Sequence, residues 1–530
     1  MAINFGDVLD RIGERRRDEL ALTSDTGSLS WAEFTSRTNA LAHGLLAQGL
    51  TAGDKVGFYL FNGADYVETL AACLKARLVH VNINFRYLPN ELDYVLNDVE
   101  VSALVFDHRL ADRVEQLPEQ TRARILRFTN SDASGNGDCV SLSELRENHE
   151  TSLLDTERRG DDFIFICTGG TTGQPKAVMW EQADLARALF REALGSESRD
   201  HTDVDLIARL DEPKAYTSPL VASPLMHGAG LLAVLTTFAN GGHVIVTDNN
   251  GPFDARHHWM LVERHKADAL AIVGDAFAKP LLQALEQGHF NLESLRLIGS
   301  SGVMWSRPVK QKFLEYIPQV KLFDSLGSSE AMGLGASMMD ADGSTQTARF
   351  TLGVSCAVFD EDNQPVLPGS GKPGFLARSG PMPRGYYNDP DKTARTFREI
   401  DGVRYCFPGD MCTVEADLTI NLLGRGSSCI NTGGEKVFPE EVEEALKLHP
   451  DVSDALVFGL DDPNWGQSVT AVVLWTGDVQ FDVEVLRTFL RDHLAPYKIP
   501  KRIHATDQAM RKANGKADYA GMKALFPRAA

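Results

Sequence analysis

Residues 168–176 concentrate groups that bind phosphate into one short stretch, Thr-Gly-Gly-Thr-Thr-Gly-Gln-Pro-Lys. Glycine lets backbone amides approach an anion closely, and successive amides in such a turn form a concave anion site. The threonine hydroxyls and Lys176 add donors and positive charge. Pro175 stands where a Walker A loop needs a glycine before its lysine, so the stretch predicts a polyphosphate-binding loop of another kind. Taken alone, a Gly/Thr-rich surface turn fits this composition equally well.

A second candidate site lies at residues 324–330, Asp-Ser-Leu-Gly-Ser-Ser-Glu, which follow the apolar segment 320–323. A carboxylate on a loop of small residues suits Mg²⁺, which prefers oxygen ligands and often bridges one carboxylate to substrate phosphates. Glu330 is the candidate ligand. The alternative is a helix N-terminus with serine caps and a glutamate that matches the helix dipole, which is the commoner structure for such a segment.

Three single residues have both an ordinary and a chemical interpretation. His227, in Pro-Leu-Met-His-Gly-Ala-Gly, is more often a satisfied core histidine than a functional one. Asp410 follows a glycine and accepts hydrogen bonds either within a turn or from ribose hydroxyls. Lys516 ends the segment Lys-Ala-Asn-Gly-Lys and, by itself, is an ordinary solvated charge.

The elements that must position these residues alternate between short apolar strands and amphipathic helices, which predicts an α/β fold with mostly parallel sheets. The predicted strands are 56–60, 79–83, 103–106, 163–166, 243–246, 270–273 and 295–298. Asp254 is expected to cap a helix. The Gly/Pro-rich region 365–390 predicts turns between short strands, as in a distorted antiparallel or barrel-like piece.

The pattern changes after Gly424 and predicts a separate α+β unit, so we place a domain boundary near 425. Pro439 suits the first turn of a helix. Strands are expected at 454–459 and 468–475, and a helix at 482–494.

Bulk properties exclude several classes of protein. A chain of 530 residues is too long for one core and predicts two or three domains. A net charge of −20 argues against a nucleic acid or an anionic membrane as partner. The seven cysteines form no Cys-x-x-Cys and favour free thiols in a reducing cytoplasm. The longest apolar stretch, 225–239, is too short to span a bilayer.

Taken together and in order, the motifs resemble those of the adenylate-forming superfamily, which includes acyl-CoA synthetases, firefly luciferases and the adenylation domains of peptide synthetases. The resemblance covers essentially the whole chain and extends to the Gly/Ser turn 299–302, Gly424-Arg425 and residues 433–441, Gly-Gly-Glu-Lys-Val-Phe-Pro-Glu-Glu. It implies a large N-terminal domain, 1–425, of two stacked α/β sheet subdomains plus a small distorted β-barrel. A small mobile α+β C-terminal domain, 426–530, would follow.

The resemblance also implies a role for each matching residue. The β- and γ-phosphates of ATP would be held by Thr168, Gly169, Gly170, Thr171, Thr172, Gly173 and Lys176. Adenine would be surrounded by Ser301, Gly302, Asp324, Ser325 and Leu326, and the ribose held by Asp410 and Arg425. Ser329 would lie at the α-phosphate, Glu330 would bind Mg²⁺, and His227 would stand between the acyl tunnel and the adenylate. Lys516 would be the adenylation lysine, and Gly433 and Gly434, with Lys436 nearby, would line the pantetheine channel for coenzyme A.

The chain departs from the family pattern at four positions. Leu326 replaces the usual aromatic platform for adenine, so apolar contact replaces stacking there. Gly169 stands for serine, Ala177 for glycine, and Ser427 for the hinge aspartate or lysine. None of these changes removes a charged catalytic group, so activity is expected to survive.

Several of these variants resemble the actinobacterial steroid-side-chain acyl-CoA synthetases, as do segments 178–180, 272–277 and 430–436. This likeness implies an ATP-dependent, AMP-forming acyl-CoA synthetase for a bulky or long hydrophobic acid, with a steroid- or terpenoid-like acid favoured. Small residues could leave room for such a substrate: Gly228, Ala229, Gly230, Gly274, Ser300, Ser301 and Gly302.

Other functions stay open at this point. One alternative is a medium- or long-chain fatty acid–CoA ligase, another an acyl-AMP ligase that loads a carrier protein, and a third a catalytically dead binding protein. An amino-acid substrate is disfavoured, because Asp254 fits a helix cap better than an amine-binding carboxylate. The expected partners are the acid, ATP and coenzyme A, with no nucleic acid and no membrane span. A cytoplasmic location is expected, and a homodimer is left open.

Overall fold

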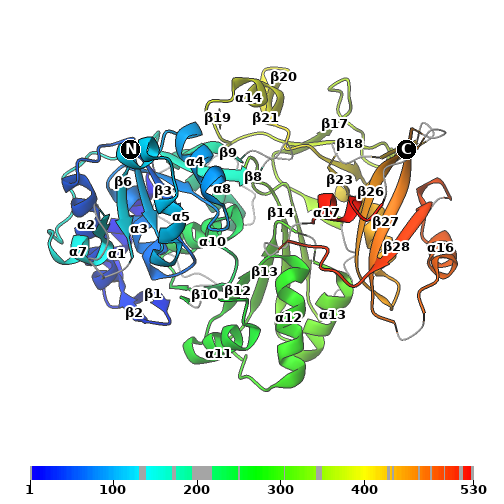
Figure 1. The fold of residues 1–530 in the computed structure, drawn as a ribbon, viewed down its shortest axis with the longest axis horizontal. Helices are drawn as coiled ribbons and strands as arrows, with labels where there is room; N and C mark the ends of the chain where they lie inside the picture. The colour runs from blue at the N-terminus through cyan, green and yellow to red at the C-terminus, as the bar shows by residue number, and fades with distance from the viewer. Residues whose placement is uncertain are drawn as a thin grey trace.

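Three β-sheets with flanking helices make up the computed structural model (Figure 1). It describes residues 3–130, 139–169, 175–193, 218–248, 251–303, 305–341, 349–425, 430–432, 435–462, 466–477, 480–494, 496–512 and 517–526. In Figure 1 strands β3, β6, β8 and β9 of the first sheet are blue and cyan, strands β12 to β14 of the second sheet are green, and strands β26 to β28 of the C-terminal sheet are orange and red.

The first sheet has eight strands in the order β19-β9-β8-β4-β3-β5-β6-β7. Their bounds are β3 Lys55–Tyr59, β4 Val79–Asn82, β5 Ala103–Phe106, β6 Leu126–Thr129, β7 Cys139–Ser141, β8 Phe163–Gly169, β9 Pro175–Glu181 and β19 Gly385–Tyr386. Its helices are α1 Phe5–Arg15, α2 Trp31–Ala47, α3 Ala64–Lys75, α4 Pro89–Asp98, α5 Ala111–Glu115, α6 Glu119–Arg124, α7 Leu142–Glu147 and α8 Gln182–Ala193. Strands β3 to β8 pair in parallel, whereas β9 is antiparallel to both β8 and β19.

The second sheet has fifteen strands and changes character along its length. Its first part is β1 Leu20–Ser24, β2 Gly27–Ser30, β10 Pro219–Val221, β11 Val244–Ile245, β12 Ala269–Ile272, β13 Leu297–Ser301 and β14 Lys321–Leu326. The helices of this part are α10 Gly228–Ala239, α11 Ala255–His265, α12 Gly274–Gln287 and α13 Arg307–Tyr316. From β1 through β11, β10, β12 and β13 to β14 the pairing is parallel.

Beyond β14 the second sheet is antiparallel. These strands are β15 Gly335–Met339, β16 Arg349–Leu352, β17 Cys356–Phe359, β18 Gly374–Arg378, β20 Phe397–Ile400, β21 Val403–Cys406, β22 Asp410–Val414 and β23 Thr419–Arg425, with α14 Pro390–Thr396 beside them. The antiparallel piece predicted from the Gly/Pro-rich region is therefore present. It continues directly from the parallel strands through the β14–β15 pair.

The C-terminal unit is a small five-stranded α+β domain. Its strands are β24 Ile430–Thr432, β25 Glu435–Val437, β26 Val452–Asp462, β27 Gly466–Trp475 and β28 Arg502–Thr506, and its helices are α15 Pro439–Lys447, α16 Val483–Arg491 and α17 Tyr519–Lys523. Pro439 takes the first helical position, as expected. The boundary near 425 stays a prediction, since residues 426–429 lie outside the described residues.

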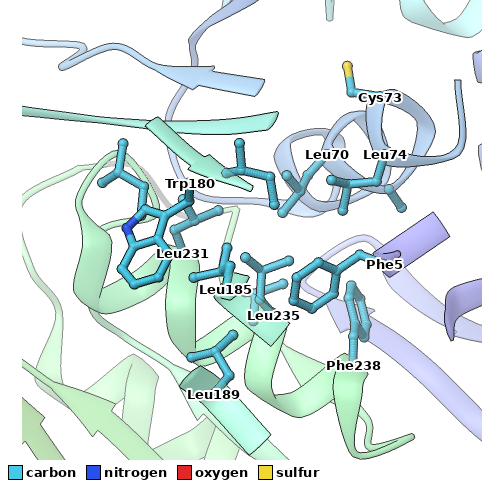
Figure 2. Packing of buried hydrophobic residues seen from close by; sticks show 14 of the residues in the cluster. Phe5, Leu70, Cys73, Leu74, Trp180, Leu185, Leu189, Leu231, Leu235 and Phe238 are labelled. Atoms are coloured by element: carbon cyan, nitrogen blue, oxygen red, sulfur yellow. The ribbon is translucent and has the colours of Figure 1, made fainter. Parts of the chain in front are cut away.

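Helices between the first two sheets bury a shared apolar core. Figure 2 shows Phe5 of α1, Leu70 and Leu74 of α3, Leu185 of α8 and Phe238 of α10 packed together. Burying a large apolar side chain stabilises the fold by about 1.5–3 kcal/mol. This core therefore fixes the two sheets against each other, and with them the strand ends that carry the candidate site.

Most predicted elements are observed, although several of their bounds differ. The strand expected at 295–298 begins at Leu297 and extends to Ser301. The alternative of a helix at Glu330 is wrong, because β14 and β15 pair as a hairpin that closes at Leu326 and Gly335. Residues 327–334 are thereby left as a connecting loop that contains no helix, although the Ser328 hydroxyl accepts from the amides of Glu330 and Ala331. Asp254 caps α11 as predicted, accepting from the His257 amide at 3.0 Å.

Candidate functional site

The candidate phosphate loop lies at the tip of a β-hairpin. Strands β8 and β9 pair Thr168 with Lys176 and Gly169 with Pro175. Residues 170–174, which include the predicted Gly170, Thr171, Thr172 and Gly173, lie outside the described residues. The hairpin thus brings the two ends of the predicted loop together.

Lys176 is held in place by helix α4. Its Nζ lies 3.2 Å from Asp98 Oδ1 and 5.9 Å from the centre of the Tyr94 ring. Burial acts to lower the pKa of Lys176, but hydrogen bonds with Tyr94 and Asp98 outweigh it and raise the pKa. The lysine therefore stays charged at neutral pH at the base of the loop.

Glu330 and Ser329 lie in the β14–β15 loop and are anchored to the first sheet. Trp180 Nε1 donates to the Ser329 carbonyl at 2.8 Å, and Tyr386 Oη donates to Glu330 Oε1 at 2.6 Å. Burial raises the pKa of Tyr386 above its ordinary value, and the Glu330 charge raises it further. The phenol is therefore a permanent donor that orients the Glu330 carboxylate.

The candidate adenine residues lie at the carboxyl ends of two neighbouring parallel strands. β13 and β14 pair Ser300 with Asp324 and Ser301 with Ser325. Gly302 follows with φ +85°, a left-handed conformation that glycine adopts readily. Ligands in open α/β sheets bind outside such strand ends. The structure thus groups the residues predicted to surround adenine.

Asp324 forms an ion pair that was not predicted from the sequence. Its Oδ2 lies 2.8 Å from Nζ of Lys310 on α13, and both side chains are only 8% exposed. Burial raises the pKa of Asp324, whereas the Lys310 charge acts in the opposite direction. This ion pair fixes the end of β14.

His227 occupies the N-cap position of α10, without a side-chain hydrogen bond to the helix. Its backbone is extended, and the helix begins at the next residue, Gly228. A Cβ built on Gly228 would lie 3.4 Å from Ser329 Oγ. The start of α10 therefore lies directly against the loop that carries Glu330.

Asp410 and Arg425 are partners across adjacent strands. β22 and β23 place Asp410 opposite Arg425. Asp410 is 9% exposed and follows Gly409, which has φ +99°. The pairing brings the two predicted ribose residues to neighbouring backbone positions.

Of the candidate residues in the C-terminal domain, Gly433, Gly434 and Lys516 lie outside the described residues. The backbone of Lys436 lies on β25, opposite Asn431. An isolated bridge pairs Arg511 with Ala517 and so brings the two sides of the Lys516 segment together. The domain itself contacts α12, where Lys279 Nζ donates to the Ser453 carbonyl at 2.5 Å.

Four side chains that hold parts of the candidate site together were not predicted from the sequence: Tyr386, Trp180, Lys310 and Asn82. Trp180 lay within a segment singled out for its resemblance to a subgroup. The other three carried no local signal, because each acts on a partner that is distant in the sequence.

Two family models match the chain. The model described as AMP-binding enzyme covers residues 9–387, and the model of the AMP-binding enzyme C-terminal domain covers residues 441–516. The chain belongs to the AMP-binding enzyme family. This membership confirms the predicted adenylate-forming type of enzyme.

Relatives of similar length support the membership. A 3-oxocholest-4-en-26-oate–CoA ligase of Rhodococcus rhodochrous is 37% identical, over 98% of this chain and 95% of its own length. A medium/long-chain-fatty-acid–CoA/3-oxocholest-4-en-26-oate–CoA ligase of Mycobacterium marinum is 38% identical, over 98% of this chain and 96% of its own length. The predicted resemblance to steroid-side-chain acyl-CoA synthetases is thereby confirmed.

Solved structures share the fold. The anthranilate CoA ligase AuaEII in complex with anthranoyl-AMP has a TM-score of 0.83 at 18% identity, covering 99% of this chain and 97% of that one. ATP-bound MatB from Rhodopseudomonas palustris has a TM-score of 0.81 at 22% identity, covering 99% of both chains. Within the described ranges, no helix combines the length and the apolar character needed to cross a membrane.

Proposed function

We propose that this protein is an AMP-forming acyl-CoA synthetase that activates a bulky or long hydrophobic carboxylic acid, with a steroid- or terpenoid-like acid favoured. The observation that carries the proposal is the convergence of three predicted groups. The base of the phosphate loop, the Glu330 loop and the start of α10 are joined through Trp180, Tyr386 and Gly228. These groups come from both large sheets and would hold ATP and an acid in one place.

In the first half-reaction, a carboxylate oxygen of the acid attacks the α-phosphorus of ATP, and the bond to pyrophosphate breaks. Residues 168–176 would hold the departing phosphates, and Lys516 would neutralise charge on the transferring group. Positioning two reactants in this way can supply several kcal/mol of the barrier. The product is an acyl-adenylate that stays beside His227.

In the second half-reaction, the thiol of coenzyme A attacks the acyl carbon, and the bond to AMP breaks. The C-terminal domain would turn near residue 425, withdraw Lys516 and bring Gly433 and Gly434 to the thiol channel. Gating of this kind lets one site run two reactions in sequence. Such a turn would break the contact between Lys279 and the Ser453 carbonyl.

The residues around Glu330 fit a magnesium ion. Mg²⁺ takes hard oxygen ligands and is commonly held by one or two carboxylates plus substrate phosphates. Glu330 supplies one carboxylate, which Tyr386 orients. The preceding residue, Ser329, carries a hydroxyl. When bound, the ion would neutralise phosphate charge as pyrophosphate leaves.

The proposed substrate class rests on the relatives. Relatives that match nearly the whole chain are named for a cholestenoic acid and for medium- and long-chain fatty acids. Of the small residues predicted to leave room, Gly230 is closely packed, since a Cβ built there would lie 2.5 Å from the Pro224 carbonyl oxygen. A cytoplasmic location is proposed with this substrate class, because ATP and coenzyme A are the cosubstrates.

An acid panel tests the function. Enzyme, ATP, Mg²⁺ and coenzyme A are mixed with straight-chain, aromatic, steroid and diterpenoid acids, and AMP, pyrophosphate and thioester are measured by mass spectrometry. We expect stoichiometric AMP and thioester, with the highest kcat/KM for a polycyclic acid. ADP formation, or acyl-AMP accumulation without thioester, would contradict the proposal. A phosphopantetheinyl carrier protein offered in parallel tests whether the acceptor is a carrier rather than free coenzyme A.

A further inference from the structure

Asn82 is a buried amide at the carboxyl end of β4, where this strand lies beside β8. It is 2% exposed. Its Oδ1 accepts from the Cys167 amide at 2.7 Å, and its Nδ2 donates to the Cys167 carbonyl at 3.2 Å. Nδ2 also donates to the Met226 carbonyl at 2.6 Å. One side chain thus joins two segments that are far apart in the sequence.

The contact with Cys167 lies beyond the last backbone pair of β4 and β8. Their register pairs His80 with Ile164 and Val81 with Phe165. Cys167 is two residues further along β8, and there the Asn82 side chain offers one acceptor and one donor, as a peptide unit would. Strand β8 is thereby held as far as the residue that precedes Thr168, where the predicted phosphate loop begins.

The contact with Met226 fixes the other segment one residue before His227. Two side chains assist from the same side. Asn62 Oδ1 accepts from the Leu225 amide at 2.8 Å, and Tyr66 Oη donates to the Leu225 carbonyl at 3.0 Å. Asn82 extends this support and links it to strand β8.

An apolar side chain of similar size would leave the Cys167 amide and the carbonyls of Cys167 and Met226 without these partners. A buried amide is unfavourable unless its polar atoms are paired, and Asn82 pairs both of them. The two segments it joins lead into the predicted phosphate loop and into the predicted acyl-side histidine. This placement relates the amide to the site rather than to the core alone.

We infer that Asn82 is a positioning residue that fixes the end of β8, from which the predicted phosphate loop begins, relative to the segment that leads to His227, and so aligns ATP with the carboxylate during adenylation. The inference rests on the proposed function. Misplacing reacting groups by about 1 Å can cost roughly a hundredfold in rate. The adenylation half-reaction is affected most, because only that half uses the pyrophosphate end of the loop.

The test is Asn82→Asp, which keeps the shape and the acceptor for the Cys167 amide. The carboxylate loses both donors and faces the carbonyl oxygens of Cys167 and Met226. We expect kcat for adenylation to fall about ten- to a hundredfold, with KM for ATP and for the acid changing less than about threefold. Conversion of preformed acyl-AMP to thioester should fall much less.

Asn4→Asp is the matched control. Asn4 is equally buried, at 0% exposure. Its Oδ1 accepts from the Gly6 amide at 2.8 Å and its Nδ2 donates to the Arg159 carbonyl at 2.8 Å, so it also loses its donors when it becomes aspartate. This variant should keep both half-reactions in proportion to the folded fraction measured by thermal unfolding. If Asn82→Asp does not fold, Asn82→Ala is measured in its place.

A double-mutant cycle with His227→Ala separates coupling from general damage. If Asn82 acts partly by placing His227, then His227→Ala should lower the adenylation rate less in the Asn82→Asp variant than in the wild-type protein. Equal loss in both half-reactions, unchanged adenylation, or full additivity with His227→Ala would overturn the inference. Wild-type protein that releases no AMP with any acid would instead refute the proposed function itself.

Discussion

Glu443 is a carboxylate enclosed by the C-terminal domain, and replacing it with glutamine should stabilise that domain at alkaline pH. Its Oε1 accepts from the Val457 amide at 2.9 Å and from Tyr519 Oη at 3.1 Å. Burial raises the pKa of Glu443 to about 7, and the nearby Glu440 charge adds to the increase. Hydrogen bonding to Val457 and the charges of Lys447 and Arg511 act in the opposite direction.

The magnitude follows from this pKa. An increase from 4.5 to about 7 corresponds to a penalty of about 3 kcal/mol for burying the charged form. Between these pH values the folded domain binds a proton that the unfolded chain does not, so stability falls as pH rises and the full penalty applies above pH 7. Glutamine keeps the accepting oxygen and removes the charge.

The assay is native-state hydrogen exchange of amides on β26 and β27, at pH 5 and at pH 8. We expect Glu443→Gln to raise the free energy of opening by about 1–3 kcal/mol at pH 8 and by much less at pH 5. Glu484→Gln, at a side chain that is 62% exposed on α16, is the control and should change stability by less than about 0.5 kcal/mol. A variant that is destabilised equally at both pH values would refute the reasoning.

Three further substitutions test the site. Tyr386→Phe removes the donor to Glu330 Oε1, so the rate of adenylation should fall about tenfold and a higher Mg²⁺ concentration should be needed. An unchanged dependence of pyrophosphate release on Mg²⁺ would contradict the assignment of Glu330. Arg511 lies at one side of the Lys516 segment, and Arg511→Met removes its hydrogen bonds of 2.6 and 2.9 Å to Asp454. This variant should slow adenylation and spare thioester formation from acyl-AMP. Equal losses in both half-reactions would indicate general unfolding. Lys516→Ala should abolish adenylation yet still convert preformed acyl-AMP to thioester, and equal loss of both half-reactions would show that its assigned role is wrong.

Local chemistry explains why much of the fold could be predicted. Asp254 and Pro439 begin helices because a capping carboxylate and a proline without an N–H act within one turn. Strand β8 was predicted from its apolar residues alone, although it continues to Gly169. Such signals depend only on near neighbours in the sequence.

Tertiary pairing decided the features that could not be predicted. The segment at Glu330 has the composition of a helix start, but the antiparallel pairing of β14 with β15 makes it a loop. Tyr386 reaches Glu330 only because β19 pairs with β9 of the first sheet. Asn82 of the first sheet contacts Met226, which lies in the segment between β10 and α10. None of these contacts leaves a periodic pattern in the sequence.

The candidate site residues could be recognised in the sequence more readily than the residues that hold them in place. Ser301, Asp324 and Ser325 come together at adjacent strand ends because parallel strands share one edge for their carboxyl ends. The Lys310 partner of Asp324 comes from α13, and no spacing rule places it there. The predicted site residues therefore lay in recognisable motifs, whereas the residues that hold them belong to the packing of helices and sheets.

The transfer of oxygen from the acid to AMP tests the central claim most directly. An accepted acid labelled with ¹⁸O in its carboxylate is incubated with enzyme, ATP, Mg²⁺ and coenzyme A, and the AMP is analysed by mass spectrometry. If the carboxylate attacks the α-phosphorus, one labelled oxygen remains with AMP when the thiol displaces it. We predict AMP that carries one ¹⁸O for each thioester formed. Unlabelled AMP, or ADP with labelled phosphate, would contradict adenylation at this site.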